Sequence, residues 1–129
     1  MPNSYKSLSD CPLFKEGDEV EVWYMNEGFF SDGIMGNSGD IDPKNLNKTH
    51  VLLGTIDGFT NGIVFENEQI ADRLFFLLQG ERWSSNGEAR ELILDKGLFH
   101  TSMSVGDIIR FKDGDTYFCS KEGWKNLNG

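Results

Sequence analysis

The stretch VGDIIRFKDGDTYFCS, residues 105–120, constrains the fold more than any other part of the sequence. Apolar and polar residues alternate on both sides of Asp113-Gly114, a dipeptide typical of tight hairpin turns. The pattern therefore predicts antiparallel strands over 106–112 and 116–120, joined by a two-residue turn.

Two further strands are expected nearer the N-terminus. In residues 18–25, Val20, Val22 and Tyr24 alternate with acidic residues and Trp23, and THVLLGTIDG predicts a buried strand over 49–56. Residues 26–48 hold four glycines and many Asn and Asp, which indicates a long loop or short irregular strands. A loop of that length in a compact domain is usually functional or mobile.

Two helices are expected between the strands. The first covers 67–79, with Asn67 as its N-cap and Gly80 ending it in the left-handed conformation. The second begins at a capping box formed by Ser85 and Glu88 and ends at Gly97. The apolar residues of the first helix are so numerous that it should be central and well buried.

Strand and helix runs are segregated along the chain, which disfavours a doubly wound parallel sheet. We expect one α+β domain over 14–129, in which a small, mostly antiparallel sheet packs against two helices. The polar residues 1–13, with two of the three prolines, should form an extended arm.

The charge excludes some partners. The formal net charge is -9, and residues 1–66 carry 11 acidic against 4 basic side chains. Nucleic-acid affinity depends on Lys and Arg neutralising phosphates, so direct binding of nucleic acid or of an anionic membrane is disfavoured. No apolar run approaches the ~20 residues that span a bilayer, and no export signal is visible, so we expect a cytoplasmic protein.

Neither a metal nor a cofactor is expected. Cys11, Cys119, His50 and His100 could supply four zinc ligands, but none has a partner at the short spacing of zinc motifs. The Asp and Asn residues of 37–45 fit no EF-hand pattern. No nucleotide-binding glycine loop is present either.

The stretch WSSNGEARELILDKGLFHTSMSVGDII, followed by a hairpin and Gly-Trp, resembles a C-terminal module of small proteins from phages and other mobile elements. The module is similar to the YodL-like family, some members of which sit beside anti-restriction genes. It covers about 83–127, and Ser85 stands where the family often has Pro. The resemblance implies a provenance and no particular activity. The matching positions are Trp83, Asn86, Gly87, Glu88, Ala89, Gly97, His100, Thr101, Ser102, Met103, Ser104, Val105, Gly106, Asp107, Tyr117, Gly123 and Trp124.

The run HTSMS has two interpretations. With Asp107 it contains every residue type of a serine-nucleophile triad, but neighbouring side chains on one extended segment point to opposite sides and cannot converge unaided. We therefore expect a structural connection in which Met103 enters the core and the serines bond nearby backbone groups. The alternative is a small enzyme or ligand-binding domain with a polar pocket at Trp83, His100 and Ser102. We expect no intrinsic catalysis.

The leading functional hypothesis is a phage or mobile-element accessory protein that binds a host or phage protein, with antagonism of a host defence as one form. The Gly-rich segment 26–48 would offer the adaptable surface. Mimicry of DNA by acidic residues is a further form. The candidate partner surface comprises Phe29, Phe30, Ile34, Met35, Asp18, Glu19, Glu21 and Glu27.

Overall fold

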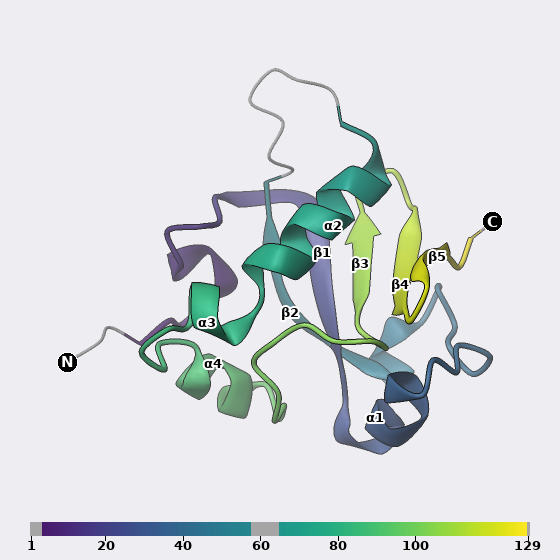
Figure 1. Cartoon of the computed structure of the whole chain (residues 1–129), viewed down its shortest axis with the longest axis horizontal. Coiled ribbons are helices and arrows are strands. Elements are labelled where there is room, and N and C mark those ends of the chain that lie inside the picture. Colours follow the sequence, from purple (N-terminus) through teal and green to yellow (C-terminus); the bar gives the residue numbers. More distant parts are fainter. Residues whose placement is uncertain (1–3, 58–64, 129) are drawn as a thin grey trace.

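The computed structural model describes residues 4–57 and 65–128 and confirms a single α+β domain (Figure 1). Two short 3₁₀ turns, η1 (Leu8–Asp10) and η2 (Leu46–Lys48), accompany the strands and helices. In chain order these are β1 (Glu16–Met25), α1 (Glu27–Ile34), β2 (His50–Ile56), α2 (Asn67–Leu77), α3 (Gly80–Trp83), α4 (Arg90–Asp95), β3 (Ile108–Phe111), β4 (Thr116–Ser120) and β5 (Gly123–Asn126).

The five strands form one sheet in the order β2-β1-β3-β4-β5, and every neighbouring pair is antiparallel. The four strands expected from the sequence are present, which confirms the antiparallel sheet. β5 is an additional strand that the sequence pattern did not predict, and it pairs with β4 through Cys119 and Trp124. No helix among the described residues is long and apolar enough to cross a bilayer.

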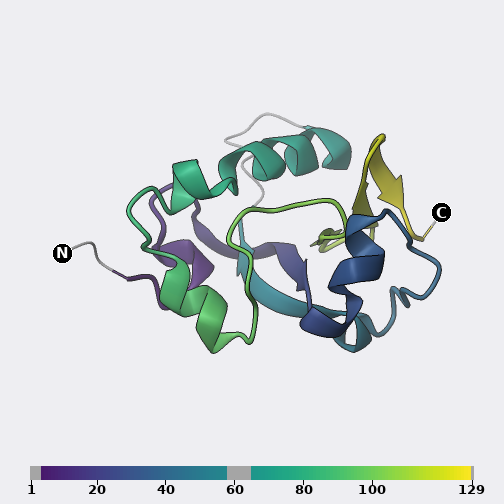
Figure 2. The ribbon, with the colours of Figure 1, turned by 60° about the horizontal axis from the view of Figure 1, so that its bottom comes forward.

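Both faces of the sheet are covered by apolar side chains. Successive side chains of β1 point to opposite faces and so contribute to two different core clusters. Val22 and Tyr24 join the larger core cluster, together with residues of α2, α3 and α4. Trp23 and Met25 join a second cluster with Phe29 of α1. Figures 1 and 2 show α2 and α3 along one face of the sheet, while α1 lies at the end where β1 finishes.

The β3–β4 turn is one residue longer than predicted. The N–H of Gly114 donates to the carbonyl oxygen of Phe111 (2.9 Å), so the central turn residues are Lys112 and Asp113. Gly114 follows in the left-handed region at φ 103°. A turn closed by a left-handed glycine is the usual three-residue hairpin loop.

The predicted ends of the first helix were partly wrong. Glu66 is the N-cap of α2, and its backbone N–H donates to the side chain of Gln69 (2.9 Å). Asn67 instead donates from its side-chain amide to Asp113 (3.0 Å) and Asp115 (3.1 Å), so it fastens the helix to the β3–β4 turn. Gly80 begins α3 rather than ending α2.

The predicted capping box at Ser85 and Glu88 was also wrong. α4 begins only at Arg90, and the hydroxyl of Ser84 accepts the N–H of Ala89 (2.9 Å). Glu88 accepts the N–H of Asn86 within the preceding turn (2.7 Å). Gly97 does follow this helix in the left-handed region, at φ 73°, as the sequence predicted.

Residues 4–13 are not an extended arm, and residues 1–3 lie outside the described part. η1 packs on β2, and Leu8 and Cys11 are each only 1% exposed. Gly54 of β2 makes room for this contact, since a Cβ there would lie 2.7 Å from the Cβ of Leu8. The segment therefore covers one edge of the sheet.

Candidate functional site

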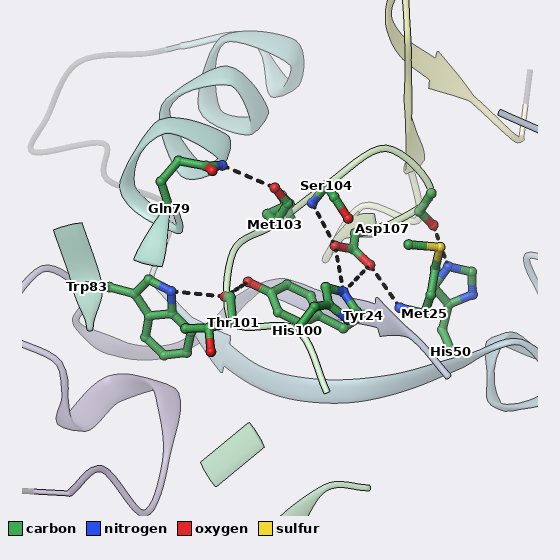
Figure 3. A network of polar contacts seen from close by, with 11 residues as sticks. Tyr24, Met25, His50, Gln79, Trp83, His100, Thr101, Met103, Ser104 and Asp107 are labelled. Carbon is green, nitrogen blue, oxygen red and sulfur yellow. Dashed lines mark hydrogen bonds and ion pairs between the residues drawn. The ribbon is translucent and has the colours of Figure 1, made fainter. Parts of the chain in front are cut away.

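Residues 98–107 form a connector that runs from α4 to β3 and passes the ends of α2 and β1 (Figure 3). Met103 is 1% exposed, as predicted, and its N–H donates to the carbonyl of Leu78 (3.1 Å). The side chain of Gln79 donates to the carbonyl of Met103 (3.1 Å). The connector is thus bonded to the C-terminal end of α2.

All three predicted pocket residues, Trp83, His100 and Ser102, use a polar atom within the protein. The indole N–H of Trp83 and the hydroxyl of Tyr24 both donate to the carbonyl of Thr101, at 3.1 and 2.8 Å. The hydroxyl of Ser102 accepts the N–H of Gly80 at 2.7 Å. Trp83 is 1% exposed, so its ring belongs to the core.

Asp107 is the hub of the connector. Its carboxylate is fully buried and accepts the backbone N–H groups of Met25 and Ser104, each at 2.8 Å. The Nε2 atom of His100 lies 3.1 Å from both carboxylate oxygens. One side chain therefore joins the end of β1, the serine run and the histidine.

His100 lies among aromatic rings. It stacks on Tyr24 with 4.6 Å between ring centroids and a 17° interplanar angle, and it contacts Phe30 and Phe99 at 5.4 and 5.6 Å. Because an ionised carboxylate only accepts, Nε2 carries the proton. Nδ1 is buried without a hydrogen-bond partner among the described residues.

The predicted failure of the triad residues to converge was wrong for one pair, since His100 and Asp107 do meet. A bend at Ser104–Gly106 brings them together, and the N–H of Asp107 donates to the carbonyl of Ser104 (3.0 Å). The hydroxyl of Ser104 is buried and unpartnered in the described structure, whereas that of Ser102 bonds to Gly80. In this arrangement the pair holds the connector in place and has no solvent-facing ring nitrogen to offer a substrate.

His50 supports the same bend from β2. Its Nε2–H donates to the carbonyl of Gly106 (2.7 Å), which leaves Nδ1 to accept the hydroxyl of Thr49 (2.7 Å). Burial lowers the pKa of His50, although its bond to Gly106 and the charge of Asp107 act in the opposite direction. His50 is therefore a neutral structural residue near pH 7.

The four candidate zinc ligands, Cys11, Cys119, His50 and His100, lie in different surroundings. Burial raises the pKa of the Cys119 thiol to about 12. The thiol of Cys11 lies 3.8 Å from the carbonyl of Trp83, whereas His50 bonds to Thr49 and Gly106. Within residues 4–57 and 65–128, no group of three or more His, Cys, Asp or Glu side chains could hold a metal ion.

α1 lies directly on the connector, and a contact between two glycines makes this possible. A Cβ on Gly106 would lie 2.8 Å from the carbonyl carbon of Gly33 and would also overlap the sulfur of Met25. Gly106 has φ 102°, which other residues rarely adopt. The sequence pattern of residues 26–48 predicted a long loop or short irregular strands, and it did not predict α1.

An exposed apolar surface results where α1 meets the connector. Ile34 is 41% exposed, Met35 62% and Phe99 51%, and the half-buried ring of Phe30 lies 4.6 Å from that of Phe99. We call these four residues the α1 surface. Phe99 was not among the residues predicted for this surface, and its only signal in the sequence is its place beside His100.

Phe29 does not belong to this surface, and its predicted exposure was wrong. It is 5% exposed and its ring lies 5.3 Å from that of His50. The N-cap Asn26 sets the phase of the helix by accepting the N–H of Phe29 (2.9 Å), which turns this side chain inward.

The four predicted acidic residues fall into separate places. Asp18 pairs with Lys112 (3.1 Å) and Glu21 with Arg110 (2.6 Å). Glu27 begins α1, at the opposite end of β1 from Asp18 and Glu19.

Comparison with protein-family models, with curated proteins and with solved structures finds no match.

Proposed function

We propose that this chain is a protein-binding module and that the α1 surface is its contact site. The observation that carries the proposal is the group of exposed apolar side chains at Ile34, Met35 and Phe99. Contiguous exposed apolar side chains mark interaction sites more often than scattered ones do. Phe30 and Ile34 are one helical turn apart, so both project from the same side of α1.

The charge around the surface indicates the kind of partner. Residues 26–43 contain Glu27, Asp32, Asp40 and Asp42 and no Lys or Arg. Lys125 donates to the hydroxyl of Ser38 in this segment (2.9 Å), so one cation balances part of the charge. An acidic segment that carries exposed apolar side chains favours a partner that combines apolar side chains with basic ones, because complementary potentials steer association. We therefore propose a partner protein with a basic, apolar surface.

A role as an accessory protein of a phage or another mobile element is part of the proposal. The partner would be a host or phage protein of the cytoplasm, and antagonism of a host defence is the form we favour. This part is supported by the HTSMSVGD motif. DNA mimicry receives less support, since two of its four acidic residues are paired with cations.

The test is capture through a photo-crosslinker placed at Met35, from lysates of host cells with and without the mobile element. We expect one basic protein to be crosslinked, and Ile34→Ser with Phe99→Ser to abolish the crosslink while circular dichroism stays unchanged. Phe76→Ser is the matched control, because Phe76 is an exposed aromatic residue (44%) on α2. Sedimentation of the pure protein tests a second copy as the occupant.

Equal loss of the crosslink in the Phe76 control, or retention in the double variant, would contradict the proposal. A concentration-dependent dimer that the double variant abolishes would assign the surface to self-association instead. The alternative of an enzyme or ligand-binding domain at His100 and Ser102 stays a hypothesis, and turnover lost in a folded Ser102→Ala variant would support it.

A further inference from the structure

A second candidate site lies at the end of the sheet opposite α1. The start of β1, the N-terminal end of α2 and the β3–β4 turn come together there (Figure 1). A hollow of about 360 Å³ lies between them. Val20, Ile70 and Phe111 line it with apolar groups, and all three are at most 7% exposed. Phe65 forms an exposed wall (41%). The volume falls within the usual range for ligand sites.

The rim of this acidic hollow carries an excess of negative charge. Glu19 and Asp113 line it together with one cation, Lys112, which is already paired with Asp18 (3.1 Å). The carboxylate of Glu19 makes no hydrogen bond or ion pair with any residue in 4–57 or 65–128. Asp113 accepts the amide of Asn67, which holds it at the rim.

Elsewhere in this protein, an arginine side chain already binds between an aromatic ring and a carboxylate. On the other face of the sheet, the guanidinium of Arg110 lies 5.3 Å from the ring centroid of Trp23 and 2.6 Å from a carboxylate oxygen of Glu21. The acidic hollow is also lined by an aromatic residue, Phe65, and by two acidic residues, Glu19 and Asp113. No arginine of the described chain lines it.

We propose that the acidic hollow binds the side chain of an arginine presented by a partner protein. The guanidinium would stack on Phe65 and donate to Glu19 and Asp113, while its methylene stem covers the apolar floor. Arginine fits better than lysine, because its planar fork can stack on a ring and bond two acceptors at once. This site is separate from the α1 surface, so either can fail without the other.

The test is a titration of the full chain, followed by amide NMR, with acetyl-Gly-Arg-Gly-amide. We expect saturable shifts at residues 19, 67 and 113, at least threefold weaker binding of the lysine tripeptide, and no binding of the norleucine tripeptide. Glu19→Gln with Asp113→Asn should weaken binding at least fivefold. The Asp113→Asn change keeps a side-chain oxygen that can accept the N–H of Asp115 within the turn. The matched control is Glu91→Gln with Asp95→Asn, which removes the same charge from exposed positions of α4.

Three results would overturn the proposal. Shifts that spread over the acidic surface without saturating would indicate nonspecific attraction. Equal affinities for the arginine and lysine tripeptides would remove the case for a guanidinium site. Equal weakening by the double variant and by its α4 control would show that net charge alone is responsible.

Discussion

Asp107 shows how a single buried carboxylate can decide a local structure. It accepts two backbone N–H groups and faces His100, so the Ser104–Asp107 bend is closed by one side chain. His100, Ser102, Met103, Gly106 and Asp107 of HTSMSVGD therefore have a structural explanation, whereas the buried hydroxyl of Ser104 has none. The sequence displayed these residues but could not show that the bend brings His100 back to Asp107, because an extended segment was assumed.

Asp107→Ala should lower the free energy of unfolding by about 3 kcal/mol, because it leaves the N–H groups of Met25 and Ser104 buried without acceptors. Asp107→Asn should cost less, since one oxygen remains. Urea denaturation measures both, with the exposed Asp95→Asn as control. A loss below about 1 kcal/mol for the alanine variant would show that the bend does not depend on the carboxylate.

His50 should make stability depend on pH. Its pKa in the folded chain lies below the ordinary 6.5, with burial as the main cause. Below pH 6.5 the imidazole of His50 is protonated in the unfolded chain but still neutral in the folded chain. The free energy of unfolding therefore falls as the pH drops toward the folded pKa. Above pH 6.5 this contribution is constant.

Urea denaturation from pH 8 to pH 5 tests this, with wild type and His50→Gln compared. The variant should be less stable at pH 8 yet lose less stability on acidification. The difference between the two curves isolates His50 from His100 and the carboxylates. Parallel curves would mean that His50 does not resist protonation.

At the scale of elements, the outcome depended on where periodicity was strong. The 105–120 hairpin and α2 have long apolar patterns, so their existence was predictable from residues such as Ile109, Phe111 and Leu74. α1 was missed, because Gly28 and Gly33 lower helix propensity and suggest a loop. β5 was missed because GWKN has no apolar alternation and pairs only through its contact with β4.

The candidate site was predictable only in part for the same physical reason. That Met103 enters the core followed from its apolar character. The burial of Phe29 and the exposure of Phe99 depend on the rotation of α1 and on its contact with the connector, which are long-range packing effects. The sequence could place Ile34 and Met35 on the surface, but it could not show that Phe30 of the same helix contacts Phe99.

Two glycines with nearly equal φ give a direct test of how α1 is held. Gly106 (102°) and Gly114 (103°) both pay the strain of a left-handed backbone when replaced by alanine, about 1 kcal/mol. The new Cβ at position 106 would overlap Gly33, whereas a new Cβ at position 114 would have no atom within 4 Å. Gly106→Ala should therefore destabilise by at least about 2 kcal/mol more than Gly114→Ala.

Thermal or urea unfolding of the two variants gives this difference. A Gly33→Ala variant should resemble Gly106→Ala, because a Cβ there would overlap Met25 and Phe29. Equal destabilisation by Gly106→Ala and Gly114→Ala would show that α1 can shift away from the connector at little cost.

On the scale of the whole molecule, the sheet separates two surfaces of different character. The α1 surface lies where β1 ends, and the acidic hollow lies where β1 begins. Figure 1 shows the two ends of β1 on opposite sides of the molecule. The connector is what links the first of these to the core, since it contacts α1 on one side and the α2 end on the other. The central claim is that HTSMSVGD acts as the platform for α1.

Hydrogen exchange of the His100→Ala variant tests this claim most directly. Removing the ring takes away its contacts with Phe30, Phe99 and Tyr24, so the amides of α1 should lose protection while those of α2, β1 and β3 keep theirs. Phe76→Ala is the control and should leave α1 protected. Unchanged protection of α1 in His100→Ala, or an equal loss across the whole sheet, would contradict the account.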